Sequence, residues 1–315
     1  MKMGITVGLG ARGERTIAGL TDRAGEIERR GFDSMWMPAA FSFDPITALV
    51  AATRATSRLE VGTAVLPTFP RHPVVMAQQA LTAQAVLDGR FTLGIGLSHT
   101  VMMEDALGLR FERPAAHLEE YVAVLAPLLA GAPAAFHGER YRVNVAVDIV
   151  GAAPVPLLVA AMGPVVLRLA GRLTDGTVTS WVGPRTLDQH IVPTIRGAAQ
   201  DAGRPAPRVA VGLPVMLTDD AVAARERLAA RAAWYTTLPS YRAMFEREGV
   251  AGPADVALIG DEAALDAGLG RLRDAGATDF LAQILADDTA SAERTFEYLT
   301  AQCARRHDTP MAHGS

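Results

Sequence analysis

Short apolar runs alternate along the chain with longer segments whose apolar residues recur at helical spacing. Most of the runs are almost continuously apolar, which is typical of strands buried on both faces of a parallel sheet. The eight runs with this character are Gly4 to Leu9, Ser34 to Met37, Glu60 to Leu66, Phe91 to Gly96, Leu157 to Ala160, Gly176 to Thr179, Arg208 to Leu217 and Asp279 to Ile284.

The segments between these runs have the pattern of amphipathic helices. Pro73 to Leu87, for example, opens with proline in its first turn and ends before Asp88-Gly89, a typical pair of start and stop signals. The other helices predicted in this way are Arg15 to Arg30, Val165 to Arg172, Thr186 to Ala202, Glu262 to Asp274 and Thr289 to Arg306.

Strict alternation of strands and helices predicts an α/β fold. Parallel strands need a crossover of about a dozen residues or more, and each intervening segment supplies one. Eight such units in 315 residues favour a (β/α)8 TIM barrel with insertions, a fold that usually takes about 250 residues before insertions. An open doubly wound sheet is the alternative, because alternation alone does not show closure.

Two stretches fall outside the repeat. Residues 137–149 alternate polar and apolar side chains and predict a hairpin inserted before the fifth strand, and residues 234–256 predict an extra helical excursion. Long insertions in a barrel commonly act as lids or oligomer contacts. No linker divides the chain, so residues 1–306 are expected to form one domain, followed by a disordered tail at 307–315.

Composition narrows the class of protein. Half of the residues are hydrophobic, 20% are charged and the net charge is −4, which is ordinary for a globular protein and excludes disorder. Cys303 is the only cysteine, so an internal disulfide or a multi-cysteine metal site is excluded. No basic run indicates nucleic acid, and no apolar window is long enough to span a membrane. We expect a cytoplasmic protein.

Gly8 to Gly13 fits the G-x-G-x-x-G pattern of dinucleotide-binding folds. Such a fold also places an acidic residue at the end of the second strand, where it binds the ribose. Asp33 precedes that strand here and Pro38 follows it. We therefore interpret the glycines as ordinary turn residues.

The carboxyl ends of the third to sixth strands are rich in small and hydroxyl residues. In a barrel, catalytic and ligand-binding groups gather at this end. Gly163 stands where the fifth strand meets a helix, and free N–H groups at a helix start suit a phosphate or carboxylate. Ser180 and Trp181 end the next strand beside that junction.

Two phrases in these segments, "RHPVVMAQQALTAQAVLDGRFTLGIGLSH" and "AAMGPVVLRLAGRLTDGTVTSW", resemble the luciferase-like monooxygenase superfamily and, within it, oxidoreductases that use coenzyme F420, a deazaflavin. The resemblance covers nearly the whole chain. It implies a TIM barrel with insertions, a homodimer, and hydride transfer between the deazaflavin C5 and a small organic substrate at the barrel mouth.

The resemblance also implies which residues form the site. It implies a non-proline cis peptide at Ala64-Val65, behind the central ring of the cofactor. Gly96, Leu97 and Ser98 would line the ring edge. The remaining cofactor contacts that it implies, along the ribityl chain and phosphate, are Ala161, Met162, Gly163, Pro164, Ser180, Trp181 and Val182.

One departure from the family pattern changes the choice of proton donor. Many relatives carry a charged or imidazole residue just after the second strand, where this chain has Pro38-Ala39-Ala40. Asp44 follows, but its place before Pro45 predicts a helix N-cap. His99, at the end of the fourth strand, becomes the candidate catalytic acid/base, with a pocket wall or cofactor contact as the alternative.

Three readings of function remain open from the sequence. The first is an F420-dependent reductase or dehydrogenase. The second is an FMN-dependent monooxygenase in the same pocket, and the third is a cofactor-binding protein without turnover. No histidine spacing indicates a metal site. Candidates for an apolar pocket lining are Met102, Met103, Leu107, Tyr141 and Trp234.

Overall fold

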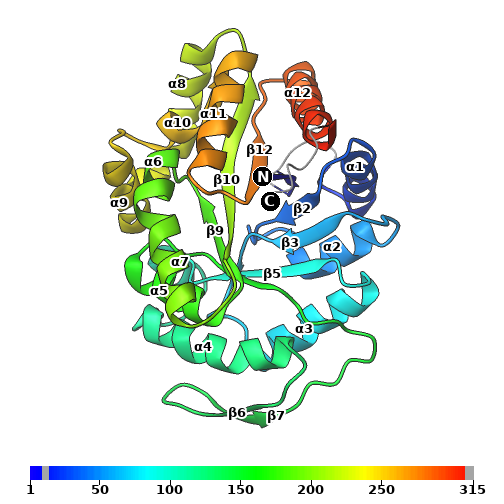
Figure 1. Cartoon of the computed structure of the whole chain (residues 1–315), viewed down its shortest axis with the longest axis vertical. Coiled ribbons are helices and arrows are strands. Elements are labelled where there is room, and N and C mark those ends of the chain that lie inside the picture. The colour runs from blue at the N-terminus through cyan, green and yellow to red at the C-terminus, as the bar shows by residue number, and fades with distance from the viewer. Residues whose placement is uncertain (9–13, 309–315) are drawn as a thin grey trace, which may run out of the picture.

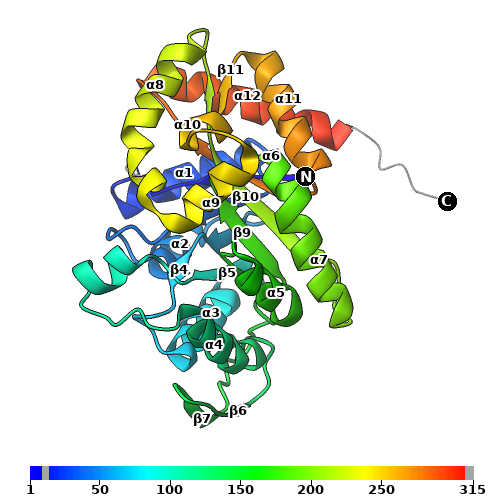
Figure 2. The same ribbon diagram turned by 90° about the vertical axis from the view of Figure 1, so that its left-hand side faces the viewer.

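The computed structural model describes residues 1–8 and 14–308, in which eight parallel strands close into a barrel (Figures 1 and 2). Each strand is hydrogen-bonded to two neighbours, and the first pairs with both the second and the last. In order around the barrel the strands are β1 (Lys2–Thr6), β2 (Ser34–Met37), β3 (Glu60–Thr63), β5 (Phe91–Gly96), β8 (Leu157–Val159), β9 (Gly176–Ser180), β10 (Arg208–Leu217) and β12 (Asp279–Ile284). The predicted TIM barrel is confirmed.

Helices connect the strands and cover the outside of the barrel (Figure 1). They are α1 (Ile17–Arg29), α2 (Pro45–Thr53), α3 (Pro73–Val86), α4 (Pro114–Leu129), α5 (Pro164–Leu173), α6 (Pro184–Thr186), α7 (Val192–Asp201), α8 (Ala221–Ala232), α11 (Glu262–Asp274) and α12 (Thr289–Asp308). Two π-helical turns, η1 (Val101–Ala106) and η2 (Leu187–Ile191), lie beside the ends of β5 and α6.

Three boundaries differ from the prediction. The first strand lies two residues earlier, at Lys2–Thr6, and residues 9–13 of the glycine motif lie outside the described residues. The third run is interrupted by a cis peptide at Ala64-Val65, after which the short strand β4 (Leu66–Pro67) continues beside β5. α12 continues to Asp308, and residues 309–315 of the predicted tail lie outside the described residues.

The insertions form two separate structures. A two-stranded antiparallel hairpin, β6 (Ala134–His137) and β7 (Arg142–Val145), begins three residues before the predicted start and lies beyond α3 and α4, at the bottom of Figure 1. The second insertion contains η3 (Ala233–Thr237), α9 (Pro239–Glu248) and α10 (Pro253–Val256). It leads into β11 (Leu258–Gly260), a strand missed by the sequence analysis, which pairs with the last residues of β10.

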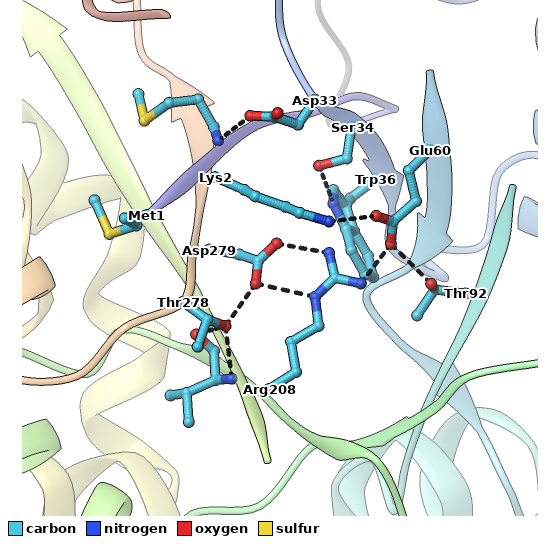
Figure 3. A network of polar contacts seen from close by, with 12 residues as sticks. Met1, Lys2, Asp33, Ser34, Trp36, Glu60, Thr92, Arg208, Thr278 and Asp279 are labelled. Atoms are coloured by element: carbon cyan, nitrogen blue, oxygen red, sulfur yellow. Dashed lines mark hydrogen bonds and ion pairs between the residues drawn. The ribbon is translucent and has the colours of Figure 1, made fainter. Parts of the chain in front are cut away.

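The amino-terminal end of the barrel interior holds a network of charged side chains, the floor network (Figure 3). Arg208 Nε and Nη2 donate to the two carboxylate oxygens of Asp279, at 2.9 and 2.6 Å, and Arg208 Nη1 donates to Glu60. Thr92 Oγ1 donates to Glu60 Oε1 at 2.8 Å, and Lys2 lies 3.5 Å from the other Glu60 oxygen. Every charged group in this network therefore has an opposite charge beside it.

Above the floor network the barrel is filled by apolar side chains. Trp36, Leu158, Val178, Ala210 and Leu281 are buried together, and Arg208 lies over the Trp36 ring at 5.3 Å. This interior layer separates the floor network from the carboxyl end of the barrel. Among the described residues, no helix is long and apolar enough to cross a membrane.

Candidate active site

A cavity of about 380 Å³, the mouth cavity, opens at the carboxyl ends of the barrel strands. Its lining comes from strand ends and from the loops that follow them, with a further wall contributed by η3 and α9. The lining residues are Thr6, Pro38, Ala39, Ala40, Ala64, Val65, Pro67, Ser98, His99, Met102, Ala160, Ala161, Met162, Val178, Thr179, Ser180, Gly212, Trp234, Tyr235, Tyr241, Leu281 and Gln283.

The Ala64-Val65 peptide forms one wall of the mouth cavity and is cis, as the family resemblance implied. Two glycines of β5 leave it the room that it needs. A Cβ on Gly94 would lie 2.0 Å from the carbonyl oxygen of Thr63, and one on Gly96 would lie 2.7 Å from Val65 Cγ2. The small residues of the fourth predicted strand therefore serve the packing of this wall, and Gly96 lies behind it.

His99 follows β5 and lies against aromatic rings of the second insertion. Its ring centroid is 5.7 Å from that of Trp234, edge-on, and 5.6 Å from that of Tyr241. Burial lowers the pKa of His99 below its usual value of 6.5, so the imidazole is neutral near pH 7. A neutral imidazole has one nitrogen free to accept a proton and one that donates.

Tyr235 and Trp181 also belong to this aromatic wall, and of the two only Tyr235 lines the cavity. The Tyr235 ring lies 5.0 Å from that of Tyr241 and 4.8 Å from that of Trp181. Trp181 is buried, has a positive φ of 60° and donates its backbone N–H to the carbonyl of Gly212 at 3.2 Å. Its indole therefore supports the aromatic wall without lining the cavity.

The polar groups of the mouth cavity are neutral. Gln283 Nε2 donates to Ser180 Oγ at 3.4 Å, and Thr6 and Ser98 add two more hydroxyls. Gly212 makes room for the amide, since a Cβ there would lie 3.2 Å from Gln283 Nε2. No Lys, Arg, Asp or Glu lines the cavity among the residues that the structure describes.

Beyond Met162 the cavity wall leads into the start of α5. Gly163 and Pro164 are exposed there, and no side chain caps the first turn of the helix. A Cβ on Gly163 would meet no atom within 4 Å. His190 Nε2 lies 2.8 Å from the carbonyl oxygen of Met162, which fixes the strand end that precedes the helix.

The structure brings part of the predicted site together. The lining includes Ala64, Val65, Ser98, His99, Ala161, Met162 and Ser180. Leu97 is half-buried and Val182 is buried, both outside the lining, as are Gly96, Gly163, Pro164 and Trp181. Of the apolar candidates, Met102 and Trp234 line the cavity, whereas Met103 is buried, Leu107 is exposed and Tyr141 packs against His72 and Tyr121.

Sequence reasoning missed Gln283 and Tyr241 as cavity residues and left Tyr235 open between a lid and the core. Gln283 had a detectable signal, because it is a polar residue near the end of an otherwise apolar strand. The two tyrosines had none beyond their place in the second insertion, since their contacts with His99 depend on how that insertion folds back over the barrel.

The region after β2 has the unusual lining that the sequence indicated. Pro38, Ala39 and Ala40 face the cavity and supply no titratable group. Asp44 caps α2, where its Oδ1 accepts from the Thr47 N–H at 3.0 Å, and it also pairs with Arg71. These bonds hold the pKa of Asp44 below its usual value, although partial burial acts in the opposite direction.

Across residues 1–8 and 14–308, no three His, Cys, Asp or Glu side chains are grouped as metal ligands would be. Within the described part of the chain, His99 is the one histidine that lines the mouth cavity. The homodimer and the cytoplasmic location stay predictions.

Comparison with known proteins places this geometry in a family. A family model described as luciferase-like monooxygenase matches residues 2–302. An uncharacterised protein of Mycobacterium tuberculosis is 31% identical over 248 residues, which cover 74% of this chain and 73% of the relative.

Two further matches carry names that mention a cofactor. The F420-dependent glucose-6-phosphate dehydrogenase of Nakamurella multipartita is 34% identical over 205 residues, 59% of each chain. The solved structure of coenzyme F420-dependent tetrahydromethanopterin reductase from Methanopyrus kandleri superposes with a TM-score of 0.80 at 20% identity. That superposition covers 97% of this chain and 99% of the other.

Proposed function

The chain belongs to the luciferase-like monooxygenase family and is an oxidoreductase, and on that premise we propose that it transfers a hydride between coenzyme F420 and an organic substrate. The observation that carries the proposal is one continuous surface. It runs from the Ala64-Val65 wall and His99 along Ala161 and Met162 to the uncapped start of α5.

The residues present fit a deazaflavin. The apolar wall at Ala64-Val65 and the backbone of Ala160 offer a flat surface for a tricyclic ring. The N–H groups at the start of α5 favour a phosphate, because the helix dipole is positive there and Gly163 lets a ligand approach the backbone closely. Met162 would contact the chain between ring and phosphate, whereas Ser180, for which the resemblance implied the same contact, is hydrogen-bonded to Gln283 and is assigned here to the substrate.

When bound, F420 supplies a two-electron hydride donor or acceptor, and this chain supplies orientation, exclusion of water and a proton. The aromatic wall covers the cavity from the side of the second insertion. The neutral His99 accepts a proton from a substrate hydroxyl in the oxidative direction, and the protonated ring returns it in the reductive direction. Gln283 and Ser180 hold a substrate oxygen by neutral hydrogen bonds.

A titration of the purified protein with F420 and with FMN tests the cofactor. We expect saturable F420 binding by fluorescence and at least tenfold weaker FMN binding. Tighter binding of FMN would instead support the monooxygenase chemistry of the flavin-dependent reading. Binding of neither would contradict the proposal.

Two histidine variants separate catalysis from binding. His99→Asn should keep F420 affinity within about threefold and lower the rate of F420 oxidation or reduction by about 10²–10⁴-fold. His72→Asn is the matched control, because His72 caps α3 with a bond to the Val74 N–H and does not line the mouth cavity. An unchanged rate in His99→Asn would remove the acid/base role.

A further inference from the structure

We propose that the substrate of the mouth cavity is an uncharged, flat molecule, aromatic or conjugated, with a carbonyl or hydroxyl oxygen, and that phosphorylated and carboxylated compounds are excluded. This inference rests on the proposed function and defines the substrate class of the same site. Three features of the cavity carry it: its lack of charge, its aromatic wall and its paired neutral polar groups.

The charge of the lining is the first feature. An anionic group in a cavity needs a cation or converging N–H donors, because desolvation of an unpaired charge is expensive. The free N–H groups beside this cavity are those at the start of α5, and the proposed function assigns them to the cofactor phosphate. The lining residues that the structure describes include no Arg or Lys. The single lysine of the chain, Lys2, lies in the floor network and pairs with Glu60 at the opposite end of the barrel.

The aromatic wall is the second feature. The Tyr235 ring contacts those of both Trp234 and Tyr241, with centroids 5.3 Å apart for Trp234 and Tyr235 and 5.0 Å for Tyr235 and Tyr241. His99 closes the series. A wall of rings stabilises a flat ligand by stacked and edge contacts. Trp234 is 43% exposed, so it has surface left to offer.

The paired neutral polar groups are the third feature. Ser180 and Gln283 come from neighbouring parts of the barrel interior and are within 3.4 Å of each other. A hydroxyl and a carboxamide can each donate and accept, so together they suit one carbonyl or hydroxyl oxygen. A small number of convergent polar groups in a mostly apolar cavity is typical of sites for small neutral ligands.

The rim of the mouth cavity has the same character as its lining. Phe41 directly follows the lining residue Ala40 and is 68% exposed, and Val101 directly precedes the lining residue Met102 and is 39% exposed. Exposed apolar groups around a cavity favour the entry of apolar ligands. A sugar phosphate, the substrate in the name of the Nakamurella multipartita relative, finds no partner of opposite charge among the lining residues that the structure describes.

A matched pair of probes isolates charge from shape. 2-Acetylnaphthalene is neutral and 2-naphthoate is anionic, and both carry the same ring system. Each is titrated by calorimetry into full-length protein saturated with F420, and glucose 6-phosphate is titrated as a third probe. We expect the neutral probe to bind about 100-fold more tightly than the carboxylate, and glucose 6-phosphate not to bind.

Any of three results would overturn the inference: equal or tighter binding of 2-naphthoate, saturable binding of glucose 6-phosphate, or no binding of the neutral probe. The probes are also titrated into protein without F420. If the protein binds no F420 but still discriminates between the naphthalene probes, the proposed function fails and the charge selectivity stands. If F420 binds and the discrimination is absent, the reverse holds.

Variants test the two sides of the cavity. Trp234→Ala should weaken the neutral probe by about three- to tenfold, whereas Val222→Ala, which removes a more exposed apolar side chain at the start of α8 that does not line the cavity, should not change it. Ala40→Lys places a cation at the rim and should raise the affinity for 2-naphthoate by about tenfold. Unchanged affinities in both variants would contradict the assignment.

Arg12 needs its own control, because it lies outside the described residues. The titrations are repeated on Arg12→Gln, and the preference for the neutral probe should be unchanged. If the wild type binds 2-naphthoate and Arg12→Gln does not, Arg12 supplies a cation to the site and the inference is wrong.

Discussion

The two ends of this barrel differ in charge, although several strands contribute side chains to both. The floor network gathers Arg208, Asp279 and Glu60 in a few ångströms, each bonded to another. The mouth cavity, among the described residues, is lined only by apolar and neutral polar groups. The interior layer around Trp36 lies between them.

The two ends differ in what their polar groups bind. Buried charges are tolerable when they are fully paired, so the floor network ties three strands together and leaves no vacancy for a ligand. The mouth cavity leaves its polar groups partly free and its rings partly exposed. The charged groups of the floor network bind one another, whereas the polar groups and rings of the mouth cavity are available to bind a ligand.

The largest expected effect comes from removing the cation of the floor network. Arg208→Met leaves Asp279, which is 2% exposed, and Glu60, which is 19% exposed, without their main partner. We expect a loss of about 3–5 kcal/mol in the free energy of unfolding, measured by urea denaturation. Arg227→Met is the control, since it removes a pair with Asp287 that is about half exposed and should lose at most ~1 kcal/mol. Equal losses would refute the argument.

Acidification should charge His117, a buried histidine of α4 outside the mouth cavity. Burial, and secondarily Arg140, lowers the pKa of His117 from 6.5 to about 4. The unfolded chain then binds the proton first, so stability is complete above pH 6.5 and falls as the pH drops toward 4. At about 1.4 kcal/mol for each tenfold change in proton affinity, the loss reaches about 3 kcal/mol.

This acid sensitivity is tested by measuring the free energy of unfolding against pH for the wild type and two variants. His117→Gln keeps a polar partner for Thr68, which lies 3.0 Å from the His117 ring, and should flatten the loss of stability between pH 7.5 and pH 4. The exposed His137→Gln is the matched control and should follow the wild type. Parallel curves for all three proteins would mean that His117 does not govern the effect.

A methyl group behind the cavity wall should disturb the mouth without touching the floor. Gly96→Ala brings a Cβ to 2.7 Å from Val65 and 3.1 Å from Ala160. We expect about 1–3 kcal/mol of destabilisation and about tenfold weaker F420 binding by fluorescence titration. Gly197→Ala on α7, where a Cβ meets nothing, should instead stabilise by ~0.5–1 kcal/mol. F420 affinity that is unchanged in Gly96→Ala would contradict the role of this wall.

The smallest effect concerns a neutral member of the floor network. Thr92→Val removes the hydroxyl that donates to Glu60 and should lower the free energy of unfolding by about 1 kcal/mol. Thr82→Val is the comparison, because its hydroxyl bonds to the Gln78 carbonyl on the exposed side of α3. Thermal unfolding of the two proteins measures the difference, which vanishes if Glu60 is satisfied without Thr92.

The barrel could be predicted because its eight strands are apolar runs that alternate with helical segments. β11 was missed although it is no shorter than β8: its three residues pair with β10 outside the barrel and fall outside that alternation. α2, α4 and α8 lie in segments for which the sequence analysis gave no helix bounds.

The site was predicted in part. His99, Ser98 and Ser180 could be found from their place at strand ends, where barrels collect functional groups. The aromatic wall could not, since it joins residue 99 to residues 234–241 through tertiary packing that no local pattern encodes. Gly96 does not line the mouth cavity, and a Cβ there would meet Val65, so its contact with the cofactor stays a prediction.

One arginine of α8 gives the second insertion a property of its own. Arg225 Nη1 donates to the carbonyl of Ala254 at 2.6 Å, and Nη2 donates to that of Ile259 at 3.1 Å, so the helix before the insertion is clamped to the strand after it. The segment that carries the aromatic wall therefore leaves and re-enters the scaffold at one fastened joint. On the proposed function, a change of length or sequence between residues 233 and 253 would alter the aromatic wall while the bonds of Arg225 keep the two ends of the insertion in place.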